Sequence, residues 1–327
     1  MTPDLLDILV CPDCHGGLCA TVTRESAGRI ESGTLRCRSC EQSFPIMNCV
    51  PRFVPADSYA NSFGFQWNKF RKTQLDSQSR LPVSHDRFFA ESRWKPSEMA
   101  GKQVLDVGCG AGRFAEVALS TGANVLALDY SSAVDACFAN LGSNPRLSVI
   151  QADVYRLPLK SASFEYVYCL GVLQHTPDPH GAVLSLSPPL KAGGRLAVDF
   201  YPRLAANVLW SKYWLRPFTR RMRQERLFAI VERLVPALLP ASRALAAVPL
   251  LGRRLRYLLP IMMYYGVFPL TDEQQREWAI LDTFDMLAPA HDHPQTAATV
   301  QRWLAEAGLR DVEAERAGLV VGRATKG

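Results

Sequence analysis

Long hydrophobic runs are missing from this 327-residue sequence, although 48% of its residues are hydrophobic. The longest uncharged stretch in its C-terminal half, residues 257–271, is interrupted by Pro260, Gly266 and Pro269. This stretch is shorter than the roughly 20 apolar residues that cross a bilayer, so we expect no transmembrane helix. The first ten residues contain two aspartates and no lysine or arginine, unlike an export signal. These absences predict a cytoplasmic protein.

A strong excess of charge is also missing. The chain has 37 Lys and Arg against 31 Asp and Glu, a net charge of +6. An obligate nucleic-acid binder carries a stronger positive bias, so nucleic acid is an unfavoured partner. The hydrophobic content excludes disorder as the main state and suffices for one large or two unequal domains.

Four of the nine cysteines form two pairs with metal-ligand spacing. They are Cys11 and Cys14, and, after 22 further residues, Cys37 and Cys40. Four thiolates complete a closed tetrahedral zinc site, which folds a small domain and leaves no position for catalysis. Haem attachment at Cys11-x-x-Cys14-His15 would leave the second pair unused, and a redox pair lacks a following βαβ pattern. The spacing therefore predicts structural zinc.

The N-terminal segment resembles the short zinc-ribbon proteins that activate tRNA and translation-factor methyltransferases. The resemblance rests on residues 5–14, on Phe44-Pro45-Ile46 and on Val50-Pro51. It implies a zinc ribbon over residues 1–56, here fused to the rest of the chain.

A glycine-rich turn follows an apolar strand at residues 103–107. The turn reads Gly108-Cys109-Gly110-Ala111-Gly112, and an apolar-periodic helix runs from it to Ser120. This strand–turn–helix pattern is typical of a nucleotide site. Further strands are predicted at 124–129, 147–153, 164–169 and 195–200, and the first two of these end in Asp129 and Asp153. Such acids lie at the carboxyl edge of the sheet, where ligands bind.

The order and spacing of these segments resemble those of a class I S-adenosylmethionine-dependent methyltransferase. The resemblance covers residues 100–202 and 291–327 and implies an α/β fold, a Rossmann-like doubly wound sheet of seven strands. It assigns the methionine part of the cofactor to Asp106 and the three glycines, the ribose to Asp129 and the adenine to Asp153. The implied cofactor site also includes the neighbouring residues Cys109, Tyr130, Val154 and Leu170.

A nicotinamide dehydrogenase is the alternative with the same fold. Its glycine pattern is usually G-x-G-x-x-G, but here the third glycine comes one position early. The charge of Asp106 would oppose a diphosphate and would suit the cofactor's ammonium group. The sequence therefore favours S-adenosylmethionine.

Residues 203–290 form a predicted helical insertion after the fifth strand. Between Arg216 and Arg256 it holds ten arginines against Glu225 and Glu232. Three interpretations stay open: a helical cap with solvated arginines, a pocket for an anionic and partly apolar acceptor such as a lipid-linked sugar phosphate, and a membrane-surface or RNA-facing patch. Tyr264 and Tyr265 are candidate acceptor contacts. Residues 57–99, with the aromatic segment from Phe63, form a connecting segment with two open interpretations: closure over the cofactor, or ordinary packing between the ribbon and the main domain.

His175 is the candidate general base, because it follows the fourth strand at the carboxyl edge of the sheet. A loop-ordering role is the alternative. Asp282, Asp285, His291 and His293 are candidate residues of a substrate loop, and we expect only one of the two alternating histidines to face the site.

The sequence thus predicts methyl transfer to oxygen or carbon of a small or lipid-linked acceptor, with possible contact to an anionic membrane surface. Methylation of RNA or protein, with the ribbon as recognition module, is the second hypothesis. A non-catalytic docking protein is the third. Catechol-type metal chemistry is disfavoured because no matching acidic cluster stands in the usual places.

Overall fold

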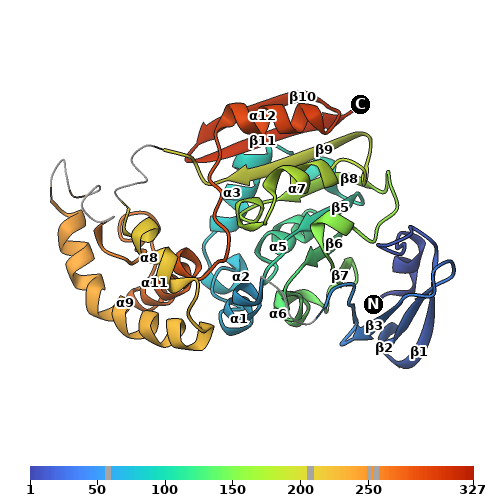
Figure 1. Cartoon of the computed structure of the whole chain (residues 1–327), viewed down its shortest axis with the longest axis horizontal. Coiled ribbons are helices and arrows are strands. Elements are labelled where there is room, and N and C mark those ends of the chain that lie inside the picture. Colours follow the sequence, from blue (N-terminus) through green and yellow to red (C-terminus); the bar gives the residue numbers. More distant parts are fainter. Residues whose placement is uncertain (56–59, 205–209, 249–251, 253–257) are drawn as a thin grey trace.

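The computed structural model describes residues 1–55, 60–204, 210–248, 252 and 258–327. Its centre is a seven-stranded sheet in the order β10-β11-β9-β8-β5-β6-β7 (Figure 1). The five strands from β5 to β9 are parallel, and β10 and β11 complete the sheet as antiparallel partners. The strand bounds are β5 (Gln103–Val107), β6 (Asn124–Asp129), β7 (Leu147–Gln151), β8 (Phe164–Cys169), β9 (Leu190–Phe200), β10 (Leu309–Ala317) and β11 (Leu319–Lys326).

The predicted α/β fold class is confirmed. Four of the predicted strands match within two residues, and the fifth, β9, begins at Leu190 instead of Arg195. The ladder between β8 and β9 is irregular between Phe164 and Tyr166, opposite the early part of β9. β9 therefore continues through a local bulge at Gly193 and Gly194. The sequence prediction placed the start of the strand after these two glycines.

Two layers of helices cover the sheet because its strands are buried on both faces. α7 (Pro179–Ser185) and α12 (Ala297–Glu306) pack on one face, and the N-cap of α12 is Thr296. α3 (Val83–Ser92), α5 (Arg113–Ser120) and α6 (Ala133–Leu141) pack on the other. The connecting segment also contains α1 (Asn61–Lys69), α2 (Asp76–Ser79) and α4 (Pro96–Met99), and short 3-10 turns lie at Pro3–Asp7, Val154–Arg156 and Leu173–His175.

The ribbon is a four-stranded antiparallel sheet beside the edge strand β7 (Figure 1). The backbone N–H of Phe53 donates to the carbonyl of Gln151 at 2.8 Å, and the Arg52 guanidinium contacts Asp135 at 2.5 Å. Leu9 and Leu35 belong to the same buried cluster as Ile150 of β7. The ribbon thereby covers an edge that would otherwise present unpaired backbone groups. Its strands are β1 (Leu18–Ser26), β2 (Arg29–Cys37), β3 (Ser43–Met47) and β4 (Val50–Pro51).

The insertion is helical, as predicted, and lies at the opposite side of the molecule from the ribbon (Figure 1). It contains α8 (Ser211–Thr219), α9 (Gln224–Ala246) and α11 (Asp272–Leu287). Phe228 of α9 and Phe284 of α11 pack against Phe65 of α1 in a separate buried cluster. Among the described residues, no helix is long and apolar enough to cross a membrane. Three of the ten counted arginines, Arg253, Arg254 and Arg256, lie outside the described residues.

Candidate functional site

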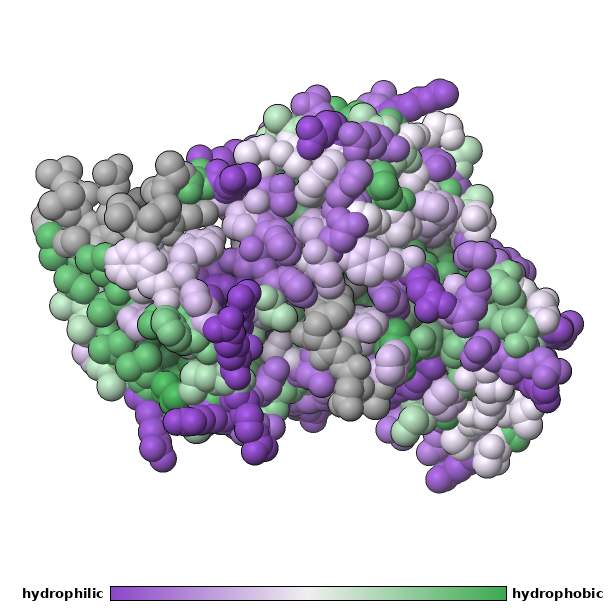
Figure 2. Space-filling model, viewed as in Figure 1, coloured by the Kyte–Doolittle hydropathy of each residue, from purple (hydrophilic) through white to green (hydrophobic). Residues whose placement is uncertain are grey.

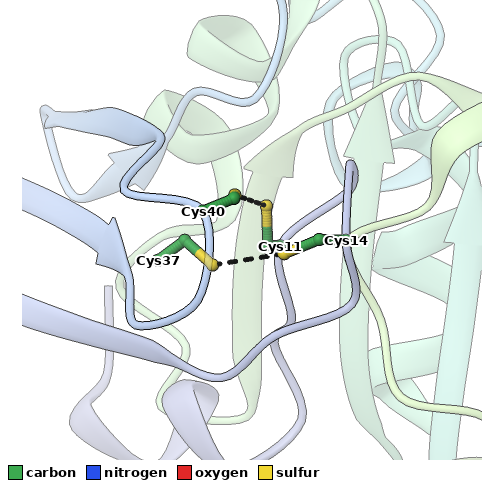
Figure 3. A group of neighbouring side chains, drawn as sticks. All are labelled: Cys11, Cys14, Cys37 and Cys40. Atoms are coloured by element: carbon green, nitrogen blue, oxygen red, sulfur yellow. Dashed lines mark hydrogen bonds between the residues drawn. The ribbon is translucent and has the colours of Figure 1, made fainter.

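Four cysteine sulfurs converge at one end of the ribbon (Figure 3). The Cys11 and Cys40 sulfurs lie 3.6 Å apart, the Cys14 and Cys37 sulfurs lie 3.4 Å apart, and all four lie within 4.8 Å of one another. A tetrahedral zinc ion with bonds of about 2.3 Å separates its sulfur ligands by about 3.8 Å. Backbone N–H groups of Cys40 and Ser39 lower the pKa of Cys37 to about 6, which favours the thiolate that zinc binds. The predicted four-cysteine cluster is confirmed, and its geometry fits structural zinc.

The glycine-rich turn joins β5 to α5 at the carboxyl edge of the sheet. Gly108 has φ = 84°, and a Cβ atom there would lie 2.4 Å from a methyl group of Val172. Only glycine combines this conformation with so close an approach. The backbone N–H of Gly110 donates to Asp129 at 3.0 Å, which ties the turn to the end of β6. Gly112 also has a positive φ, so all three glycines shape the open turn that the sequence predicted.

Asp106, at the base of this turn, is a buried acid whose hydrogen bonding is incomplete. Its side chain is buried, and its Oδ2 atom has no hydrogen-bond partner among the described residues. Burial raises the pKa of Asp106 to about 8. An ammonium group would satisfy this carboxylate, so the residues fit the cationic methionine end of S-adenosylmethionine.

Asp129 and Asp153 lie at the ends of neighbouring parallel strands. Asp129 accepts from the Ser131 backbone N–H at 2.8 Å, and burial raises its pKa. One oxygen of Asp153 accepts from the Tyr155 N–H at 3.0 Å, while the residue stays half-buried at the rim. Each acid thus has a fixed orientation beside the turn, which suits hydrogen-bond donors of a ribose and of an adenine.

The remaining predicted cofactor residues surround these acids. Cys109 and Leu170 are buried at the ends of β5 and β8, Val154 is buried beside Asp153, and Tyr130 follows Asp129. The structure brings them to one edge of the sheet without assigning a contact to any of them.

α1 lies over the glycine-rich turn. A Cβ atom at Gly110 would come within 3.1 Å of the indole nitrogen of Trp67. The Asn68 amide donates to the Ser132 carbonyl at 2.9 Å and thereby ties α1 to α6. α1 thus packs on the turn, and closure of the connecting segment over the cofactor stays a prediction.

His175 lies in a closed polar environment after β8. Its Nδ1 atom is 3.1 Å from the His291 carbonyl, which accepts only if Nδ1 carries the proton. Nε2 is then the basic nitrogen, and it is buried without a partner among the described residues. Burial lowers the pKa of His175, so the imidazole is neutral at pH 7. The rings of Phe63 and Tyr201 lie 5.3 and 5.4 Å away and complete its surroundings.

Asp282 and Asp285 lie on helix α11, and the expectation that they form a loop is therefore wrong. The sequence hid this helix because its hydrophobic residues follow no single stripe, as expected for a helix contacted on several sides. Asp285 faces the Gln66 amide and the Tyr201 hydroxyl, each at 3.5 Å. It therefore lies close to the His175 environment.

The other two candidate acceptor residues, Tyr264 and Tyr265, point to different parts of the insertion. The Tyr264 hydroxyl donates to Asp282, which accepts from the Gln74 amide at 3.1 Å, so Tyr264 points inward. Tyr265 instead lines an outer cavity of about 550 Å³, under the guanidinium of Arg243. Tyr265 is thus separated from the polar cluster that holds Tyr264.

His291 and His293 stack with ring centroids 5.8 Å apart, so both rings lie on one side. This segment is not an extended strand with alternating side chains, and the expectation that only one of the two histidines faces the site stays a prediction. The His293 N–H donates to the Gln174 carbonyl at 2.8 Å, next to His175.

A cavity of about 510 Å³ opens beside this segment. It is lined by Arg203, Leu204, Tyr213, Trp214, Asp292, His293, Pro294 and Gln295. Lys212 lies 2.8 Å from Asp292 and 4.8 Å from the centre of the Tyr201 ring. Lys212 and Tyr201 therefore lie between this cavity and His175.

Sequence reasoning missed three contributors to the site. Tyr201 and Lys212 carried no motif and enter through tertiary contacts alone. Asp199 is the last but one residue of β9, accepts from the Gly171 N–H at 2.5 Å and pairs with Arg87. Its place in an apolar strand was the only available signal.

Comparisons with known proteins agree with this geometry. Residues 105–198 match the family model described as a methyltransferase domain, and residues 2–48 match the Trm112p-like protein family. The chain carries a class I methyltransferase domain behind a Trm112p-like ribbon.

Individual curated relatives match parts of the chain. A chloroplastic, uncharacterised methyltransferase of Arabidopsis thaliana is 30% identical over 46% of this chain and 44% of its own length. A ubiquinone biosynthesis O-methyltransferase of Xylella fastidiosa is 36% identical over 34% of this chain and 47% of its own length. The chain thus spans about half the length of these curated relatives.

Among solved structures, magnesium protoporphyrin IX methyltransferase of Synechocystis is similar to this chain with a TM-score of 0.45 and 16% identity. The match covers 82% of this chain and 97% of that one. This level of likeness does not bear on the acceptor.

Proposed function

We propose that the protein transfers the methyl group of S-adenosylmethionine to oxygen or carbon of a small, partly apolar acceptor. The observation that carries the proposal is the buried Asp106 carboxyl beside the glycine-rich turn, one oxygen of which has no hydrogen-bond partner among the described residues. This group favours a cationic ligand over a dinucleotide phosphate. The methyltransferase-domain match and the O-methyltransferase relatives support the same choice.

The cofactor, when bound, supplies a methyl group on a positively charged sulfur that needs no further activation. The chain's part is to orient the acceptor and to accept its proton. We assign the proton to Nε2 of His175, because Nδ1 is occupied and the neutral imidazole has no other partner among the described residues. Asp285 lies near this ring and favours the imidazolium that forms.

The acceptor is proposed to enter through the cavity beside Tyr213 and Trp214. This cavity combines aromatic walls with Arg203 and His293, which suits an acceptor with an apolar body and a polar or anionic group. A lipid-linked acceptor would place its tail toward Trp214, whose side chain is 56% exposed.

Release of S-adenosylhomocysteine tests the proposal. The purified full chain is incubated with labelled S-adenosylmethionine and a panel of hydroxylated aromatics with and without an apolar tail. We expect release that depends on both protein and acceptor. Release only with RNA or protein acceptors would favour the macromolecular alternative, which the Trm112p-like domain supports. Cofactor binding without release on any acceptor would favour the docking role.

A further inference from the structure

The helical insertion exposes large apolar side chains. Six of the eight large hydrophobic residues that are most exposed among the described residues belong to it: Trp214, Phe218, Ile230, Val248, Leu258 and Val267. Phe218 is 72% exposed. Trp214 and Phe218 are four residues apart on α8 and so share one helix face. Solvated caps rarely gather so many exposed apolar groups in one lobe.

The outer face of α9 changes along its length. Arg226, Ile230 and Arg233 follow one another at helical spacing, and all are exposed. The same stripe continues with Ala237, Ala241 and Ala244, which are also exposed, and the exposed Val248 follows the end of the helix. From residue 234 to its end at Ala246 the helix has Arg243 as its single charged residue. A charged first half, in which Glu225 and Glu232 are exposed beside the arginines, thus leads into an apolar second half.

The inner face of α9 is already occupied. Leu227, Phe228, Val231 and Val235 are buried in the cluster that contains Phe284 of α11. The exposed stripe is therefore a second apolar face, which the fold of the described chain leaves open to solvent.

Arginines surround this face. In the described part of the chain, Arg220, Arg221, Arg226 and Arg233 are exposed and form no ion pair with a carboxylate. We call the exposed residues of α8 and α9, together with Arg220, Arg221 and Arg223, the cap surface. In Figure 2 hydrophobic side chains gather over this lobe, and long hydrophilic side chains line its lower edge.

We propose that the cap surface docks on an anionic lipid bilayer. Arginines attract the surface of such a bilayer, while Trp, Phe and Ile side chains enter the boundary between headgroups and acyl chains. Arginine stems extend along apolar surface and keep the guanidinium at the headgroups. A second copy fits less well, because two surfaces of the same positive charge repel each other.

Docking would also determine where the acceptor enters the protein, and this step rests on the proposed function. Trp214 belongs both to the cap surface and to the lining of the 510 Å³ cavity. Docking would therefore place the cavity mouth at the lipid surface, where an acceptor with an apolar tail resides. Binding of vesicles does not require methyl transfer, so failure of one proposal leaves the other intact.

Vesicle co-sedimentation tests the docking with the full chain. Phosphatidylcholine vesicles with and without about one-third phosphatidylglycerol are compared at 50 and 500 mM salt, chosen to bracket the screening range. We expect binding to the anionic vesicles at low salt, with at least tenfold weaker binding at high salt or without phosphatidylglycerol. Equal binding to neutral vesicles, or none to either, would overturn the proposal.

Charge-matched variants locate the contact. Each arginine near an anionic surface contributes about fivefold to binding, so Arg221→Gln with Arg226→Gln and Arg233→Gln should weaken it roughly a hundredfold. Arg38→Gln with Arg146→Gln and Arg316→Gln removes the same charge from exposed positions outside the insertion and should change it less than threefold, in the range of long-range screening. Equal losses in the two triple variants would contradict a localised surface.

Apolar variants separate lipid from other partners. Phe218→Ser with Ile230→Ser should weaken vesicle binding about tenfold, whereas Val22→Ser with Met47→Ser on the ribbon should not. Thermal melting checks that each variant folds. Binding of an RNA oligonucleotide without vesicle binding, or a dimer that the Phe218→Ser variant dissociates, would overturn the lipid assignment.

Discussion

The two flanks of the central sheet are attached in different ways. The ribbon joins β7 through backbone hydrogen bonds, such as Phe53 to Gln151, and shares one apolar core with the sheet. The insertion joins through side chains: the Gln74 amide donates to Asp282 at 3.1 Å, and the Trp278 indole donates to the Thr73 carbonyl at 2.9 Å. Its apolar cluster is separate from the two that flank the sheet.

Because of this difference, we expect the ribbon to contribute mainly to stability and the insertion mainly to acceptor recognition. Backbone pairing depends little on side-chain identity and fixes the ribbon as a cap on an edge strand. Side-chain contacts leave room for cavities and exposed faces, and the insertion has both. We therefore expect changes in the ribbon to lower stability and changes near the insertion to affect acceptor binding and turnover.

The largest expected effect follows from loss of a zinc ligand. Cys11→Ser should abolish zinc binding and lower the free energy of unfolding by several kcal/mol, because the ribbon has too little core of its own. Metal analysis and thermal melting measure the two changes.

Cys19→Ser is the matched control, since Cys19 lies in the ribbon but outside the cluster. It should keep one zinc ion per chain. Retained zinc in Cys11→Ser would refute the assigned ligand set.

The next effect concerns turnover. His175→Ala should lower turnover at least tenfold through loss of the general base, while cofactor affinity stays within about threefold. Steady-state kinetics and cofactor titration measure these quantities. Burial lowers the pKa of His175, so the imidazole stays neutral around pH 7 and turnover should not depend on pH there. Turnover should fall only when the pH drops below the ordinary histidine pKa of about 6.5.

His180→Ala is the control for this variant. The His180 side chain is 42% exposed, pairs with Glu306 at 2.7 Å and should be dispensable for turnover. Full turnover of His175→Ala would leave this residue a loop-ordering role.

A smaller change in the free energy of unfolding is expected from loss of the contacts that hold the ribbon against the sheet. Arg52 is 11% exposed and contacts both Asp135 and Gln151, so Arg52→Met should cost about 1–3 kcal/mol. Arg24→Met, which breaks a surface pair with Glu31, should cost less than about 0.5 kcal/mol. Urea unfolding compares the two. Equal costs would show that the Arg52 contacts do not hold the ribbon to the sheet.

Local patterns carried the prediction of the sheet and of the ribbon. Glycines with positive φ, strands that end in Asp129 or Asp153, and two Cys-x-x-Cys pairs are each encoded within about ten residues. The environment of His175 is different, because Tyr201, Lys212 and Asp285 reach it from three distant segments. Asp282 and Asp285 were assigned to a loop for a related reason: helix α11 is buried on several sides and shows no clear amphipathic period.

The buried carboxyl of Asp106 supports the most direct test of the cofactor assignment. The carboxyl has a pKa of about 8 in the free protein, so below that value most of it is protonated. An ammonium ligand stabilises the carboxylate and lowers this pKa, and binding at pH 7 should therefore release a proton from Asp106.

Calorimetric titration at pH 7 in buffers of different ionisation enthalpy measures affinity and proton release together. The account predicts micromolar binding of S-adenosylmethionine with close to one proton released from Asp106, no such release in Asp106→Asn, and no binding of NADH. Binding of NADH, or absence of heat with S-adenosylmethionine, would contradict it.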